Sequence, residues 1–284
     1  MKAPSFDYAR PATLDEAFSL LQQHGDGARL IAGGQTLLAT LNMRLSEPRV
    51  LVDLNGIRGL SGISLQEGHL RIGAMTRHSE IEDSFLIAQH MPLLAMTAPH
   101  VAHKAIRNKG TLGGSIAFAD PAAEWPCCAV ALDAVMVLAS KRGLRRVAAG
   151  DFFQQLYTTE LAPDEIIVAC EFPVQAPGTR CAFDELARRH GDYAIVGLAA
   201  VAQVSGKLLS GLRLVFLGTG NIPMRARAAE AVLEGQQLTA DTLAAAKRAL
   251  AEELAPAADL YNSAEMKLHL SKVLMDRLLK ALTT

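Results

Sequence analysis

The sequence predicts an α+β fold in two domains, and three features of the chain support this. Short apolar segments typical of strands, bounded by glycine or proline, recur through the first 218 residues. The tail from Met224 to Leu282 is instead rich in Ala, Leu, Glu and Lys and predicts three helices. Between these parts, Gln175-Ala176-Pro177-Gly178-Thr179 has the composition of a domain linker. Strands mixed with helices, then a helical tail, indicate an α+β protein with a boundary near Pro177.

Composition limits the classes of protein and of partner. The length of 284 residues suits two domains, or three, and the 50% apolar and 20% charged fractions are those of a globular protein. With 28 basic and 29 acidic side chains, the chain has no strong net field to attract nucleic acid or an anionic membrane. We therefore expect partners to be recognised locally, and no nucleic acid among them.

Neither a targeting segment nor a metal site is expected. The start of the chain lacks the apolar run of a secretory signal, and the apolar stretches at 127–139 and 193–204 are too short to span a bilayer. The four cysteines have no zinc or iron-sulfur spacing, and His100 with His103 supplies only two ligands. The expectation is a cytoplasmic protein with no transmembrane segment and no metal of its own.

The first part of the chain follows a strand, turn and helix pattern. Thr13-Leu14-Asp15-Glu16 resembles a capping box and predicts a helix that ends at Gly25. A strand over 29–32 then runs into Gly33-Gly34, and a helix is expected from Thr36 to Leu45. Glu67-Gly68, between alternating apolar residues, predicts a β-hairpin. Further elements are expected as helices over 92–104 (in part) and 122–132 and as strands over 134–139, 165–172, 193–204 and 211–218.

Two glycine pairs are the clearest chemical signal. Gly33-Gly34-Gln35-Thr36 and Gly113-Gly114-Ser115 each place a hydroxyl close behind two glycines, and each is predicted to form a turn. Glycine lets a backbone approach a pyrophosphate, while amide protons and the hydroxyl donate to its oxygens. The alternative is that each pair is a tight turn with no ligand. Neither pair matches the Gly-x-Gly-x-x-Gly or Gly-x-x-x-x-Gly-Lys patterns of nucleotide-binding loops.

Several motifs together resemble a known family, the FAD-binding medium subunits of molybdenum hydroxylases, which include the carbon monoxide dehydrogenase and xanthine dehydrogenase groups. The resemblance spans nearly the whole chain, although the tail after Met224 is similar mainly in pattern. The motifs that carry it are Ala32-Gly33-Gly34-Gln35-Thr36-Leu37-Leu38, Ile72-Gly73-Ala74-Met75-Thr76, the run 106–115, Ala119-Asp120-Pro121-Ala122-Ala123-Glu124, and Arg188-Arg189-His190-Gly191-Asp192-Tyr193-Ala194.

The resemblance implies a fold of the vanillyl-alcohol-oxidase type with no Rossmann unit. Two small α/β subdomains, about 1–55 and 56–177, would hold non-covalent FAD. A C-terminal α+β domain over 178–284 would close over the flavin. The molybdenum cofactor and 2Fe-2S clusters would lie on a large and a small partner subunit, in a dimer of heterotrimers.

The resemblance also implies site residues. The two glycine segments would wrap the diphosphate, Val101 would pack by the adenine or ribityl chain, and Glu124 would meet a ribityl hydroxyl. Each assignment has an alternative without a ligand. Val101, Ile167 and Val168 could simply pack in the core, and Glu124 could be a carboxylate that stabilises the start of a helix. Asp192 and Tyr193 could be a turn aspartate beside a core aromatic. The full set is Ala32, Gly33, Gly34, Gln35, Thr36 and Leu37 in the first segment, Thr111, Gly113, Gly114 and Ser115 in the second, Val101, Glu124, Ile167 and Val168 lining the cofactor, and Asp192 and Tyr193 by the isoalloxazine.

Two positions depart from the family pattern. Many relatives have histidine where Phe118 stands, and many have lysine near Phe183, where this chain has Asp184-Glu185. A lysine there would stabilise negative charge on reduced flavin, so the potential and the electron acceptor (NAD, oxygen, quinone or other) stay open.

The resulting hypothesis is an FAD-binding electron-transfer subunit that needs no catalytic acid, base or nucleophile. One alternative is a self-contained FAD oxidoreductase of the same fold, with Arg188, Arg189, His190 or Tyr193 as its acid or base. A flavin-free scaffold is the other. The substrate of the complex (carbon monoxide, an N-heterocycle, a purine or an aldehyde) is not predicted, because its pocket would lie on another chain.

Overall fold

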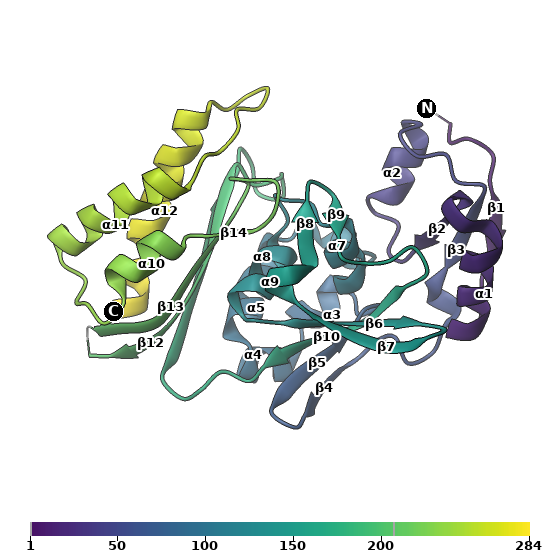
Figure 1. Cartoon of the computed structure of the whole chain (residues 1–284), viewed down its shortest axis with the longest axis horizontal. Coiled ribbons are helices and arrows are strands. Elements are labelled where there is room, and N and C mark those ends of the chain that lie inside the picture. The colour runs from purple at the N-terminus through teal and green to yellow at the C-terminus, as the bar shows by residue number, and fades with distance from the viewer. Residues whose placement is uncertain (1, 207) are drawn as a thin grey trace.

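The first subdomain is a small parallel sheet with helices beside it, at the right of Figure 1. This computed structural model describes residues 2–206 and 208–284. The sheet has the order β1-β3-β2, and every pairing in it is parallel. Its elements are β1 (Asp7–Ala9), α1 (Leu14–His24), β2 (Ala28–Ile31), α2 (Leu37–Asn42) and β3 (Val50–Asp53).

The predicted cap of α1 is present in part. The Thr13 hydroxyl accepts a hydrogen bond from the Glu16 amide at 3.2 Å, but the Glu16 carboxylate accepts from the Ala12 amide, at 2.7 Å, rather than from the amide of the capping residue. The helix ends at Gly25, whose φ of 49° suits glycine. The predicted helix from Thr36 to Leu45 is shorter than expected and ends at Asn42.

The second subdomain is a five-stranded antiparallel sheet of order β4-β5-β10-β6-β7. The hairpin expected at Glu67-Gly68 is confirmed, with Ile63 opposite Ile72. Its strands are β4 (Ile63–Gln66), β5 (His69–Gly73), β6 (Val135–Ser140), β7 (Gly143–Ala148) and β10 (Ile166–Pro173), with the small pair β8 (Phe153–Gln155) and β9 (Thr158–Thr159). Its helices are α3 (His78–Glu82), α4 (Phe85–His90), α5 (Pro92–Thr97), α6 (Lys104–Arg107), α7 (Leu112–Phe118), α8 (Glu124–Ala131) and α9 (Ala149–Phe152).

The central strand β10 is buried on both faces. Ile167 packs into the core beneath the helices of this subdomain, whereas Val168 packs into a second core shared with the first subdomain. Successive strand residues point to opposite faces, so the two neighbours serve different cores. The sheet thereby joins the two subdomains.

The C-terminal domain is a four-stranded antiparallel sheet of order β11-β12-β13-β14, with the predicted three helices on one face (Figure 1). The other face, which includes Ala199, Val201 and Val215, shares the core of the second subdomain. The elements are β11 (Thr179–Leu186), β12 (Val196–Ser205), β13 (Leu208–Leu217), β14 (Met224–Arg225), α10 (Arg227–Leu233), α11 (Ala240–Glu253) and α12 (Ala264–Thr283).

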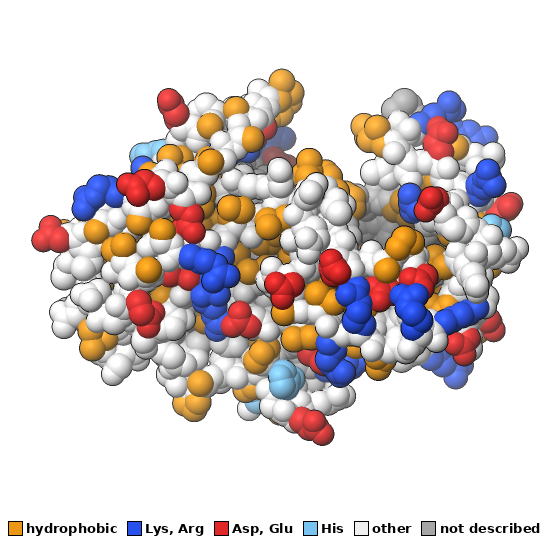
Figure 2. All heavy atoms as spheres, in the orientation of Figure 1, with side chains coloured by type: hydrophobic (Ala, Val, Ile, Leu, Met, Phe, Trp, Pro, Cys, Tyr) orange, Lys and Arg blue, Asp and Glu red, His pale blue; other side chains and the backbone are white. Residues whose placement is uncertain are grey.

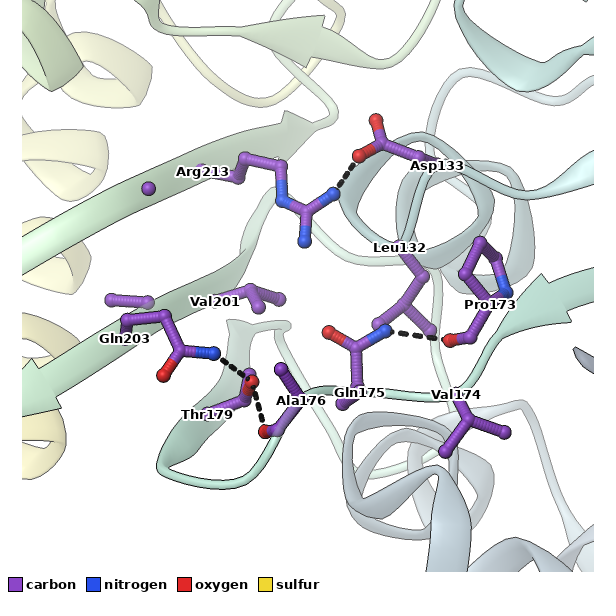
Figure 3. Close-up of a pocket in the computed structure, with 12 residues that line it drawn as sticks. Leu132, Asp133, Pro173, Val174, Gln175, Ala176, Thr179, Val201, Gln203 and Arg213 are labelled. Carbon is purple, nitrogen blue, oxygen red and sulfur yellow. Dashed lines mark hydrogen bonds and ion pairs between the residues drawn. The ribbon is translucent and has the colours of Figure 1, made fainter. Parts of the chain in front are cut away.

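Polar contacts tie the chain where it passes between β10 and β11 (Figure 3). The Gln203 amide donates to the Thr179 hydroxyl at 2.5 Å, and that hydroxyl donates to the Ala176 carbonyl at 2.7 Å. Arg213 of β13 pairs with Asp133, which follows α8. These groups surround a small cavity of about 210 Å³ between the two domains.

Over residues 2–206 and 208–284, no helix has the length and apolarity needed to cross a bilayer. In the same ranges, no group of three or more His, Cys, Asp or Glu side chains is placed to hold a metal ion.

Candidate functional site

A cavity of about 1000 Å³ lies where the first subdomain, the second subdomain and a loop of the C-terminal domain meet. This volume is at the upper end of the range for small-molecule and cofactor sites. Figure 2 shows the molecule hollowed between the first subdomain and the rest, at the upper right of the view. Its walls include residues of the segments 28–37, 101–124, 157–165 and 191–193.

The first glycine segment forms a turn that lines the cavity. The backbone runs from β2 through Gly34, with φ of 70°, into α2. Among the described residues, the structure gives no acceptor for the backbone amides of residues 33 to 36. Asn55 holds the turn in place by donating from its side-chain amide to the Ala32 carbonyl at 2.8 Å. Consecutive free amides in a turn form a concave site for an anion such as a phosphate.

The second glycine segment is a helix start, so the predicted turn is wrong here. Thr111 caps α7, its hydroxyl accepting from the Gly114 amide at 3.1 Å, and its carbonyl accepts from the Ser115 amide at 3.1 Å. The Gly113 amide donates to the Ala74 carbonyl at 2.8 Å. These three amides already have acceptors. The segment therefore contributes Gly114 and Ser115 to the cavity wall but no second set of free amides.

The four glycines therefore have different roles. A Cβ on Gly33 would overlap the backbone of Lys109, and one on Gly113 would lie 2.5 Å from the Ala74 Cβ, so both are required by close backbone packing. Gly33, Gly34 and Gly114 also line the cavity. A Cβ on Gly114 would lie 3.7 Å from the Ala32 Cβ on the facing turn.

A buried histidine that the sequence did not single out also lines the cavity. The Trp125 indole donates to His78 Nδ1 at 3.0 Å, so the neutral ring carries its proton on Nε2. Burial, with Arg107 and Arg77 nearby, lowers the pKa of His78 to about 4. The ring is therefore neutral near pH 7 and is a fixed hydrogen-bonding group in the wall. The two residues are 47 positions apart in the chain, so no local pattern could have revealed the pair.

Arg107 fixes the segment that carries Val101. Its buried guanidinium contacts the Glu82 carboxylate at 2.9 and 3.1 Å and donates to the carbonyls of Pro99, Val101 and Ala102 at 3.3, 3.2 and 2.8 Å. Ala102 has a φ of 45°, which is unfavourable for alanine and needs such support. The cavity wall at 101–103 thus depends on one arginine.

Replacing Arg107 with alanine is expected to lower the free energy of unfolding by about 3 kcal/mol, because Glu82 would lose its buried partner. The hydrogen bond from Arg107 lowers the pKa of Glu82. The contribution of the pair is therefore present above the unfolded pKa of Glu82 and is lost as pH falls through the folded pKa. Urea unfolding at pH 7 and at pH 4 measures both effects.

Arg142→Ala is the matched control, since the Arg142 side chain is 65% exposed and its shortest ion pair, with Asp164, lies at the surface, where a change within about 0.5 kcal/mol is expected. The buried Glu165, which Arg142 approaches to 3.9 Å, keeps its hydrogen bonds from Arg145. Equal losses of stability in the two variants at pH 7 would contradict the role of Arg107.

Acidic and aromatic groups also line the cavity. Glu124 opens α8, and burial followed by the charge of Glu185 raises its pKa to about 8. Burial also raises the pKa of Asp120. Tyr193 lines the cavity although its side chain is largely exposed, and Gly191, with φ of 86°, lies against the ring of His103. The walls of the cavity thus carry both free backbone amides and carboxyl and aromatic side chains.

Most of the predicted site residues meet at this cavity. Gly113, Ile167 and Val168 do not line it, and all three are packed in the protein interior, as the core-packing alternative supposes for the last two. The predicted residues that do line it are Ala32, Gly33, Gly34, Gln35, Thr36, Leu37, Val101, Thr111, Gly114, Ser115, Glu124, Asp192 and Tyr193.

Comparison with known proteins identifies the family. Residues 4–175 match the model described as the FAD binding domain in molybdopterin dehydrogenase, and residues 181–282 match the CO dehydrogenase flavoprotein C-terminal domain. The chain belongs to the family of FAD-binding subunits of molybdenum hydroxylases. It is 39% identical over 281 residues to the 6-hydroxypseudooxynicotine dehydrogenase complex subunit alpha of Paenarthrobacter nicotinovorans, covering 98% of this chain and 95% of that one.

Solved structures of the family have the same fold. Carbon monoxide dehydrogenase from Hydrogenophaga pseudoflava superposes with a TM-score of 0.96 at 37% identity, over 99% of this chain and 98% of that chain. Quinoline 2-oxidoreductase from Pseudomonas putida 86 gives a TM-score of 0.95 at 38% identity, over 100% and 98%. The predicted α+β fold, with an FAD-binding domain followed by a C-terminal domain, is confirmed.

The cavity suits the cofactor of this family. Free amides at residues 33 to 36 match the needs of a diphosphate, and Gly114 lines the cavity without a side chain. The cavity also offers Glu124 and Tyr193. FAD has a charged diphosphate at its centre and a flat heteroaromatic ring, and the groups that line the cavity are of the chemical types that bind both.

Proposed function

We propose that this chain is the FAD-binding electron-transfer subunit of a heteromeric molybdenum hydroxylase. It receives electrons from iron-sulfur clusters on another subunit and passes them to an external acceptor. The observation that carries the proposal is the amide-lined turn at residues 33 to 36 in a chain that matches the family over both of its domains. Bound flavin supplies the redox chemistry, since it can take up single electrons and release a pair.

The residues of this chain bind and orient the cofactor. The amides of residues 33 to 36 would hold the diphosphate, Ser115 would contribute a hydroxyl, and Val101 would pack against the cofactor. The loop that carries Asp192 and Tyr193 would cover the flavin and limit the access of water and acceptor. No acid, base or nucleophile is required for this role.

The partners follow from the relatives. Their names describe complex subunits, medium subunits and medium chains, as in the nicotine 6-hydroxylase medium subunit of Paenarthrobacter nicotinovorans. We infer a large subunit with the molybdenum cofactor and a small subunit with 2Fe-2S clusters, assembled as a dimer of heterotrimers. The cytoplasm is the compartment that we infer for this assembly.

A self-contained oxidoreductase is less well supported. It would require an acid or base beside the flavin, and of the candidates Arg188, Arg189, His190 and Tyr193 only Tyr193 lines the cavity. Arg188 instead lies over the ring of Tyr261, at 4.9 Å from its centroid.

The test is purification of the tagged chain from its own host, followed by metal and flavin analysis. Two further chains, carrying molybdenum and iron, should co-purify, and the flavin should be reduced by the substrate of the complex only when all three are present. Reduction of the isolated chain by an organic substrate would contradict the electron-transfer role.

Replacing Tyr193 with alanine should leave FAD bound and change the rate at which reduced flavin is reoxidised, because the ring would no longer cover its side of the cavity. Stopped-flow reoxidation with oxygen, NAD and a quinone measures this. Identical rates with every acceptor would argue against a flavin-facing Tyr193.

A further inference from the structure

One ring nitrogen of His78 is a hydrogen-bond donor that the chain itself does not use. Only 5% of the residue is exposed, and it lines the cavity. Nδ1 accepts the Trp125 indole proton at 3.0 Å, whereas the structure gives Nε2 no partner among residues 2–206 and 208–284. Polar groups that are buried in a folded protein nearly always have a hydrogen-bond partner. Nε2 is therefore free to bind a group that enters the cavity.

Trp125 decides which form the imidazole takes. An imidazolium carries a proton on both nitrogens, so neither of them could accept the indole proton. Because Nδ1 accepts it, the ring is neutral and its one proton is on Nε2. Trp125 is 1% exposed, so this contact lies inside the core. In agreement, burial lowers the pKa of His78 to about 4.

The backbone holds His78 beside the start of the second glycine segment. The His78 amide donates to the Gly110 carbonyl at 3.1 Å, and Arg77 forms an isolated antiparallel bridge with Thr111. A Cβ on Gly110 would lie 2.6 Å from Nε2, so the nitrogen is next to the Cα of that residue. Gly110 and Thr111 both line the cavity. Nε2 thus lies at the wall where the second segment begins.

Gly110 also packs against the first glycine segment. A Cβ on Gly33 would lie 2.7 Å from the Gly110 Cα, so the two backbones are in close contact. Gly33 begins the run of backbone amides, at residues 33 to 36, for which the structure gives no acceptor among the described residues. The free amides and the free imidazole N–H therefore both adjoin Gly110. An anion that the amides hold is within the same part of the cavity as Nε2.

We propose that His78 Nε2–H donates a hydrogen bond to the diphosphate of bound FAD, with Trp125 as the positioning residue that keeps the proton on that nitrogen. This inference rests on the proposed function and adds a binding residue that the sequence did not single out. A neutral imidazole brings no charge to the cavity, so its contribution is one directed hydrogen bond. A bond of this kind to a charged acceptor corresponds to about 10- to 100-fold in affinity.

The direct test is NMR of apoprotein labelled with ¹⁵N in histidine, before and after FAD is added. In the complex, the Nε2 proton of His78 should be protected from exchange with water, and Nε2 should show a scalar coupling to one phosphorus of FAD across the hydrogen bond. A proton that still exchanges freely, or that is protected without this coupling, would overturn the inference alone. A wild-type chain that binds no FAD would overturn the proposed function as well, so the two failures are distinguishable.

Two substitutions at His78 separate binding from packing. His78→Phe and His78→Gln both remove the acceptor of the Trp125 indole, so they should lose similar stability, but only glutamine keeps an N–H donor. Fluorescence titration should show FAD affinity about 10- to 100-fold weaker in His78→Phe and largely restored in His78→Gln. Equal affinities in the two variants would contradict a donor at this position. His69→Phe, at an exposed position on β5, is the matched control and should bind FAD as the wild type does.

Trp125→Phe tests the positioning role. Phenylalanine keeps an aromatic ring but has no N–H, so the proton of His78 can then reside on either ring nitrogen. The ¹⁵N shifts of the two nitrogens should move toward each other in the apoprotein, and FAD affinity should fall, but by less than in His78→Phe. Unchanged shifts would show that Trp125 does not fix the proton and would overturn the role given to it.

Discussion

Gly114→Val is expected to abolish FAD binding while the chain stays folded. The Gly114 backbone is helical, so its φ and ψ angles are also accessible to valine. A Cβ there would lie 2.9 Å from the Thr111 hydroxyl, which must shift, and 3.7 Å from the Ala32 Cβ. The branched methyl groups would fill the gap between the two segments that the diphosphate must enter. We expect affinity to fall by more than about 100-fold, or about 2.7 kcal/mol.

The loss should be confined to binding. Displacing the Thr111 cap costs about 1 kcal/mol, which a chain with three hydrophobic clusters can tolerate. Calorimetric titration of apoprotein with FAD, together with circular dichroism, separates binding from folding. Gly150→Val is the control, because a Cβ at that exposed position meets nothing within 4 Å. Unchanged flavin content in Gly114→Val would place the diphosphate elsewhere.

Gly113→Val is expected to have the opposite effect and disrupt the fold. A Cβ on Gly113 would lie 2.5 Å from the Ala74 Cβ and 2.8 Å from the Ala74 carbonyl oxygen, to which the Gly113 amide itself donates. This contact is between backbone segments of the interior, which cannot yield by a change of rotamer. The loss of stability should exceed about 3 kcal/mol.

Thermal unfolding of the two neighbouring variants is the direct comparison. Gly113→Val should melt well below the wild type or fail to accumulate as folded protein, while Gly114→Val should melt close to the wild-type apoprotein. A Gly113→Val protein with wild-type stability would refute the packing role that the structure gives this glycine.

These two glycines also show where prediction from sequence ends. The glycine pair after Thr111 predicts a turn from the sequence, and glycine also has low helix propensity. The structure places a capped helix there, since packing of Gly113 on Ala74 outweighs that propensity. Local pattern could not reveal the contact, which joins positions far apart in the chain. The first pair, with φ of 70° at Gly34, is the turn that its sequence predicts.

The same limit applies to the rest of the site. The β-hairpin at Glu67-Gly68 and the helical tail were predictable, because both depend on local periodicity and turn chemistry. The pair of His78 with Trp125 and the pair of His100 with Glu185 are tertiary contacts and left no local signal. Ile167 and Val168 pack into cores on opposite faces of the same sheet, and the sequence alone does not show that both faces are covered.

The most direct test of the central claim is the visible absorption spectrum of the purified chain, with analysis of the cofactor released on denaturation. We expect a flavin spectrum and release of one FAD per chain, with no flavin left covalently attached to the precipitated protein. A colourless protein that takes up no added FAD would contradict it, whatever the fold.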